Sequence, residues 1–234
     1  MTAVVEGKAG LKILFRRVLI WRIGIGYWLF AILFLVPVIL LGAAVNPIFG
    51  GDPLSLDTLR LTFNVLPMFI LFSIVAGLGQ ELGWAGFLTP RLQAKHTALV
   101  SSLIRAALVL LWHIPLLIFT YYQPYAIPDF PYGGWMVQKG VLITVLAMVA
   151  LGLPWSIFLT WIFNNTRGSL LLVAVLHGSE IWLATLLPGL GINTKDLNNY
   201  WGYGLIMLSA ALVIILLAGP QNFSRERERI SIHT

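Results

Sequence analysis

The sequence of 234 residues contains no cysteine, which excludes disulfides, a thiolate nucleophile and cysteine-ligated metal sites. Charged residues are also scarce, at 10% against about 25% in soluble domains, whereas 59% of the residues are hydrophobic. A soluble fold of this length has too little polar side chain to cover so much apolar surface. The composition therefore excludes a cytosolic globular enzyme, a disordered chain and a nucleic-acid-binding protein. It predicts an integral membrane protein.

Six apolar segments have about the 20-residue length that crosses a bilayer. One begins near Leu61 and fades beyond Gly79, and the other five cover residues 24–45, 98–119, 141–163, 168–188 and 201–218. The sequence thus predicts an all-α polytopic membrane bundle of about six transmembrane helices. We find no internal repeat, no linker and no segment of different composition, so residues 1–234 are expected to form a single membrane domain. The basic leader, residues 1–22, lacks a small-residue cleavage site, and we expect it to be retained.

The basic residues are distributed unevenly between the segments that join the predicted spans. If both termini lie on one side, 11 of the 15 Lys and Arg residues fall on that side. Only three fall on the other side, namely Arg60, Lys139 and Lys195, and Arg105 lies within a span. Because Lys and Arg concentrate on the cytoplasmic side of membrane proteins, we expect both termini to be cytoplasmic.

Five ionisable side chains fall inside the predicted spans, where each is energetically costly and thus a candidate for function. They are Glu81, Arg105, His113, His177 and Glu180. A helical rise of 1.5 Å per residue puts Glu81, His113 and His177 about 15, 22 and 14 Å from the inner surface. Three different helices can therefore bring these groups to a similar level in the membrane.

The spacing of these residues permits more than one chemistry. His177 and Glu180 are three residues apart and share a helix face, whereas Gln80 and Glu81 are adjacent and point about 100° apart. Two imidazoles and a carboxylate can hold zinc, and they can also activate water and stabilise an oxyanion without a metal. Polar groups that only hydrogen-bond helices together are the structural alternative.

Three motifs resemble those of the CPBP (CAAX protease and bacteriocin-processing) intramembrane protease family. Residues 79–92 (GQELGWAGFLTPRL) resemble its first motif, in which two glutamates precede three residues and an arginine. The second motif, an aromatic residue followed four positions later by histidine, corresponds to Val109 and His113. The third, a histidine followed four positions later by Asn or Asp, begins at His177. The motifs keep the family's order within about residues 75–183.

The resemblance implies an intramembrane endopeptidase that hydrolyses a membrane-proximal peptide bond in a membrane-associated or lipidated substrate. A bacterial plasma membrane is the expected location, with no nucleic-acid partner. Glu81 would act as base or metal ligand, His113 as a water-activating residue or ligand, and His177 as a ligand or oxyanion donor. The predicted catalytic set adds Gln80 and Glu180 to these three, which are also the expected ligands for zinc or another divalent metal, if one is used.

Four positions depart from the family motifs. Gln80 replaces the first glutamate, Ala85 the arginine, Val109 the aromatic residue and Ile181 the Asn or Asp. An amide is no base near neutral pH, although Gln80 can orient a water or donate to an oxyanion. Glu180 or an inward-facing Glu81 can supply a carboxylate in compensation.

The alternative that these departures favour is a catalytically inactive relative that serves as a membrane partner-binding or immunity protein. A proton-path transporter is a third interpretation, but the sequence has neither an inverted repeat nor paired broken helices.

Arg105 lies about two turns into the third predicted span. We expect its side chain to extend towards the inner headgroups, with a pairing to a carboxylate as the alternative.

Overall fold

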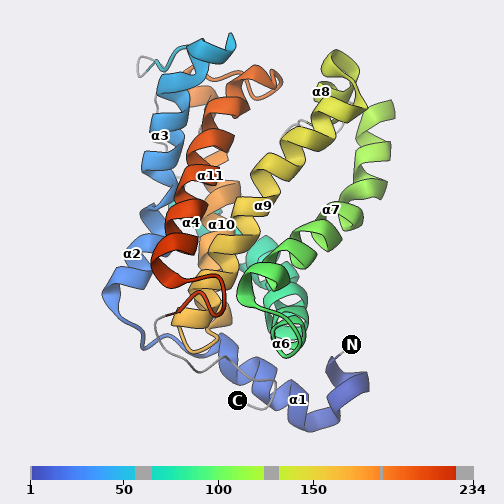
Figure 1. Ribbon diagram of the computed structural model, residues 1–234, viewed down its shortest axis with the longest axis vertical. Coiled ribbons are helices and arrows are strands. Elements are labelled where there is room, and N and C mark those ends of the chain that lie inside the picture. The colour runs from blue at the N-terminus through green and yellow to red at the C-terminus, as the bar shows by residue number, and fades with distance from the viewer. Residues whose placement is uncertain (1, 56–64, 124–131, 185–186, 225–234) are drawn as a thin grey trace.

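The computed structural model describes residues 2–55, 65–123, 132–184 and 187–224, in which every regular element is a helix (Figure 1). Five helical segments are long and apolar enough to cross a membrane: Ile25–Phe49, Pro67–Gln93, Ala98–Tyr122, Val141–Asn165 and Asn198–Ala218. The predicted all-α polytopic bundle is thus confirmed, and the chain is an integral membrane protein.

The first span comprises α2 (Ile25–Leu33), α3 (Leu35–Val45) and the short η1 (Asn46–Phe49). The later spans are α7 (Ala98–Tyr122), α9 (Val141–Asn165) and α11 (Asn198–Ala218), while α8 (Tyr132–Lys139) and η4 (Leu187–Leu190) are short connecting helices. In Figure 1, α3 and α11 stand on one side of the molecule and α7 with α8 on the other.

The predicted span at residues 168–188 differs in the structure, because α10 (Leu170–Ala184) has only 15 residues. A helix of that length rises about 22 Å, which is less than the roughly 30 Å of a hydrocarbon core. It starts late because Arg167 and Gly168 adopt left-handed backbone angles (φ 55° and 73°) directly after α9. Most of α10 is buried among the other helices. Its apolar sequence therefore reflects burial among the other helices.

The span Pro67–Gln93 is a continuous helix with two widened stretches. It runs through α4 (Val65–Phe72), η2 (Ser73–Leu78), α5 (Gly79–Glu81), η3 (Leu82–Leu88) and α6 (Thr89–Gln93). Both η2 and η3 are π-helical. Such turns are rare and frequently lie at functional sites. Gln80 and Glu81 sit between the two, and the predicted start near Leu61 lies outside the described residues.

The helix α1 (Thr2–Val18) lies across one end of the bundle rather than along it (Figure 1). Glu6 forms an ion pair with Arg91, and the Arg17 guanidinium lies 5.6 Å from the centre of the Phe163 ring. Burial lowers the pKa of Arg17, with the nearby Glu6 charge acting in the opposite direction. These contacts fix α1 to the same end of the bundle as α6.

The C-terminal end of α11 reaches this same end of the bundle. The Ala98 and Leu99 amides donate to the carbonyls of Gln221 and Pro220, and Asn165 donates to the carbonyl of Phe223. The described N- and C-terminal parts therefore lie on one side, as the sequence predicts. The assignment of that side to the cytoplasm stays a prediction.

Two glycines let η2 and α10 cross with their backbones in contact. A Cβ atom on Gly77 would overlap the backbone of Ala174, and one on Gly178 would overlap the backbone of Ser73. Small residues at a crossing allow membrane helices to approach closely. Because Glu81 follows η2 and His177 precedes Gly178, this crossing brings the two ionisable side chains together.

We expect Gly178→Val to lower the free energy of unfolding by about 1–3 kcal/mol, because the added side chain must push η2 away from α10. Thermal unfolding in detergent measures the effect. Gly26→Val is the matched control, since a Cβ at Gly26 meets no atom within 4 Å. Equal unfolding temperatures for the two variants would contradict the tight crossing.

Candidate active site

Glu81 is the centre of the polar cluster, and it is fully buried. Both of its carboxylate oxygens lie 2.8 Å from Arg105 Nη2, which donates to them from α7. Oε1 also lies 2.8 Å from Nδ1 of His177 on α10. Three helices are therefore joined at one carboxylate.

The expected orientation of Arg105 towards the headgroups is wrong. Its side chain is 3% exposed and pairs with Glu81, while Nε and Nη1 are buried and have no hydrogen-bond partner among the described residues. A buried guanidinium needs an opposite charge, and Glu81 supplies it. The positions along the helices were compatible with this pairing. Arg105 lies about 10 Å along α7 and Glu81 about 15 Å from the inner surface, so the two side chains lie at similar depths.

His177 is oriented by the carboxylate that it contacts. A carboxylate accepts hydrogen bonds, so Nδ1 of His177 donates to Glu81 and Nε2 is the nitrogen left to act on a ligand. The Trp155 ring stands at 86° to the imidazole, with 6.3 Å between the ring centres. This arrangement, in which an acidic group fixes the tautomer of a histidine, is the one that orients bases in hydrolases.

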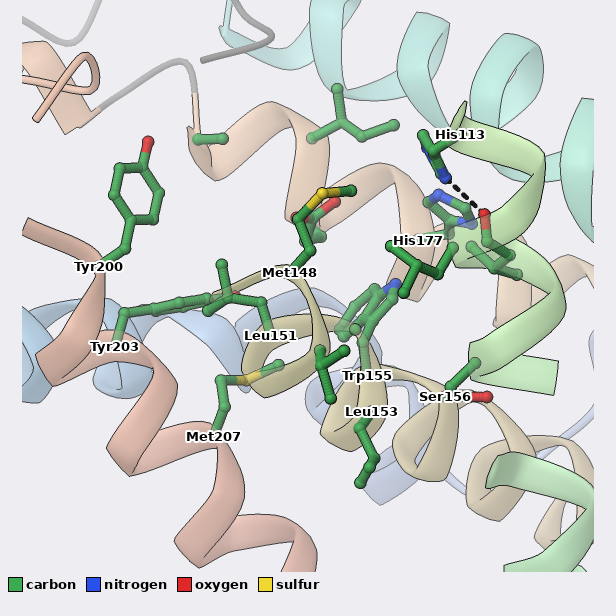
Figure 2. Close-up of a pocket in the computed structure, with 18 of the residues that line it drawn as sticks. His113, Met148, Leu151, Leu153, Trp155, Ser156, His177, Tyr200, Tyr203 and Met207 are labelled. Atoms are coloured by element: carbon green, nitrogen blue, oxygen red, sulfur yellow. Dashed lines mark hydrogen bonds between the residues drawn. The ribbon is translucent and has the colours of Figure 1, made fainter. Parts of the chain in front are cut away.

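His113 is oriented by its own helix. Its Nδ1 lies 2.8 Å from the carbonyl oxygen of Val109, which can only accept, so Nδ1 carries the proton (Figure 2). In the neutral ring Nε2 is then the basic nitrogen. The Trp112 ring packs against the imidazole at 4.9 Å between centres. The sequence did not reveal that the backbone at Val109 serves this purpose.

A cavity of about 610 Å³ joins all the predicted site residues. Glu81, His113, His177, Gln80 and Glu180 line it, together with many apolar and aromatic side chains. Figure 2 shows the two histidines on one side of this cavity, with Tyr200, Tyr203 and Met207 of α11 on the other side. The structure thus brings together residues from α5, α7 and α10, as the depth argument predicts.

The aromatic lining of the cavity was missed by the sequence analysis. Tyr132, Tyr200 and Tyr203 all line the cavity. Burial raises the pKa of the Tyr132 phenol, and the Glu180 charge adds to this effect. A pattern of aromatic residues near a helix end does not distinguish a lipid contact from a cavity wall.

The predicted metal ligands do not form a metal-binding set in this arrangement. Among the described residues, no three His, Cys, Asp or Glu side chains are placed to hold one ion. Both oxygens of Glu81 already accept from Arg105, so metal binding there would displace a buried cation. Zinc or another divalent metal at Glu81, His113 and His177 stays a prediction, and we assign it no step.

The motif departures have visible consequences. Ala85, at the position of the family arginine, is fully buried and small, and the guanidinium beside Glu81 comes instead from Arg105 on another helix. Gln80 and Ile181 both line the cavity, so each change alters the groups that a ligand would meet.

Comparison with known proteins agrees with these motifs. Residues 62–183, just over half of the chain, match the family described as type II CAAX prenyl endopeptidase Rce1-like. The chain is also 26% identical to CAAX prenyl protease 2 of Methanococcus maripaludis over 166 residues, which make up 71% of this chain and 53% of that protein. It therefore spans about half the length of this relative. The matched region contains the buried Glu81–His177 pair and the His113 helix, and the chain belongs to the Rce1-like family of type II CAAX prenyl endopeptidases.

Proposed function

We propose that this protein is an intramembrane endopeptidase that hydrolyses a peptide bond in a lipidated, membrane-associated substrate. The observation that carries the proposal is the Glu81–His177 hydrogen bond, which orients one imidazole beside a cavity that also holds the oriented His113. Two fixed imidazoles beside one cavity are the groups that acid–base hydrolysis requires. None of the four altered motif positions removes either histidine or Glu81.

In the proposed reaction, Nε2 of His113 takes a proton from water while the water oxygen bonds to the carbonyl carbon of the substrate. Gln80 orients that water through its amide. Protonated His177, held by Glu81, donates from Nε2 to the oxyanion that develops on the carbonyl oxygen. The carbon–nitrogen bond then breaks, and His113 returns its proton to the leaving nitrogen.

The cavity supports a lipidated substrate. Its volume lies within the range of ligand pockets, about 300–1,000 Å³, and its lining is mainly apolar and aromatic. An acyl or prenyl chain would be buried there by the hydrophobic effect. The name of the family and of the relative point to a prenyl group on a C-terminal cysteine.

One observation favours a second candidate function, that of a partner-binding protein without hydrolytic activity. Gln80 has no basicity, and both Glu81 oxygens accept from Arg105, so neither residue of the first motif is available as a base. Hydrolysis then depends on His113 alone. In this alternative the cavity binds the lipidated segment of a partner and releases it unchanged.

The two candidates are separated by reconstituting the full chain in proteoliposomes with a prenylated peptide that carries a fluorophore and a quencher on either side of the bonds after the cysteine. We expect hydrolysis that persists in EDTA and 1,10-phenanthroline, and none of the same peptide without its lipid. Binding of the prenylated peptide without hydrolysis would favour the partner-binding alternative. Hydrolysis abolished by chelators and restored by zinc would contradict the metal-free reaction.

A further inference from the structure

Glu180 is a carboxylate in the cavity to which neither the motifs nor the proposed reaction assigns a role. It lines the cavity on α10, one helical turn beyond His177. Within the described part of the chain it forms no hydrogen bond and no ion pair. Glu180 is half-buried. A carboxylate with little access to bulk water and no partner is costly, so an opposite charge that enters the cavity is favoured.

The charges around the cavity leave Glu180 uncompensated. Arg105 is the only Lys or Arg among the described lining residues, and its charge is cancelled by Glu81. His177, three residues before Glu180 on α10, can become positive, but its Nδ1 is already directed at Glu81. When both histidines are neutral, ionised Glu180 is therefore the one uncompensated charge among the described lining residues. When His177 is protonated, as the proposed reaction requires, its Nδ1 proton is directed at Glu81 rather than at Glu180.

The surroundings of Glu180 also suit a cation. The aromatic side chains of Tyr132, Tyr200, Tyr203 and Trp155 line the same cavity. The face of an aromatic ring attracts an ammonium or guanidinium group, most strongly away from water. Aromatic cages recognise quaternary ammonium ligands in this way.

We propose that Glu180 forms a subsite that recognises a positively charged side chain, lysine or arginine, in the substrate peptide. Residues three apart on a helix are neighbours, so the subsite lies about 5–6 Å from His177, measured between Cβ atoms. The recognised residue is therefore close in sequence to the bond that His113 and His177 act on. This inference rests on the proposed function for its substrate, but the binding that it describes does not require hydrolysis.

Binding is measured with the His113→Ala protein in nanodiscs, so that no peptide is consumed. The probes are prenylated peptides that differ at one position, with lysine or the uncharged norleucine, and the position is moved along three residues on each side of the first bond after the cysteine. We expect lysine to bind about 10-fold more tightly than norleucine at one position or more. Glu180→Gln should bring this ratio close to 1. In the Glu180→Lys protein, a peptide with glutamate at the same position should bind more tightly than the lysine peptide.

The control variant is Glu6→Gln, the same change at a carboxylate on α1 outside the cavity, which should keep the 10-fold ratio. The unfolding temperature of Glu180→Gln should be unchanged or raised, because an uncompensated charge is removed. Equal binding of lysine and norleucine peptides at every position, binding of neither, or a ratio that Glu180→Gln leaves intact would overturn the subsite. A lysine preference without hydrolysis in the wild type would uphold the subsite and refute the proposed hydrolysis.

Discussion

His113→Ala is expected to lower kcat for the prenylated peptide by about 100- to 10,000-fold, because it removes the group that takes the proton from water. His177→Ala should lower kcat by about 100- to 1,000-fold through the loss of a donor to the oxyanion. Both variants should still bind the lipidated peptide, since most of the cavity wall is apolar and unchanged. Single-turnover kinetics in proteoliposomes separates the loss in kcat from any change in binding.

The matched control for these variants is His96→Ala, which removes an exposed histidine in the turn between α6 and α7. It should leave kcat within twofold of the wild type. A His113→Ala protein with kcat close to that of the wild type would refute the assigned base. If the wild type itself hydrolyses nothing, Gln80→Glu tests whether the first motif residue alone was missing.

The second large effect concerns stability and comes from the buried pair Glu81 and Arg105. Removal of either partner leaves an uncompensated charge in the bundle, so Glu81→Met and Arg105→Met should each lower the free energy of unfolding by about 3–5 kcal/mol. The double variant should regain most of this loss, because two apolar side chains leave no unpaired charge. Denaturation in mixed micelles measures all four proteins.

The outcome of this cycle separates structural from catalytic roles. The double variant should be folded yet inactive, because His177 has lost the carboxylate that orients it. If the double variant loses as much unfolding free energy as the two single variants together, the two residues do not interact directly. Full activity in the double variant would show that His177 needs no orienting carboxylate.

The amino-acid sequence by itself determined the class of the protein and the approximate place of its site. Long apolar runs with little charge have no stable alternative to membrane helices, and this signal is local to each segment. The depths of Glu81, His113 and His177 also follow from counting residues along single helices. These features were predictable because each depends on one stretch of chain.

The tertiary structure decided which polar groups meet. Arg105 and Glu81 are 24 residues apart, and Glu81 and His177 are 96 apart, so helix periodicity alone does not specify either contact. The glycine crossing between α10 and η2 determines that His177 reaches the buried carboxylate. The sequence could identify the charges that need partners, but only the packing of the helices assigned Arg105 to Glu81 and left Glu180 facing the cavity, because pairing depends on which side chains several helices bring to one point.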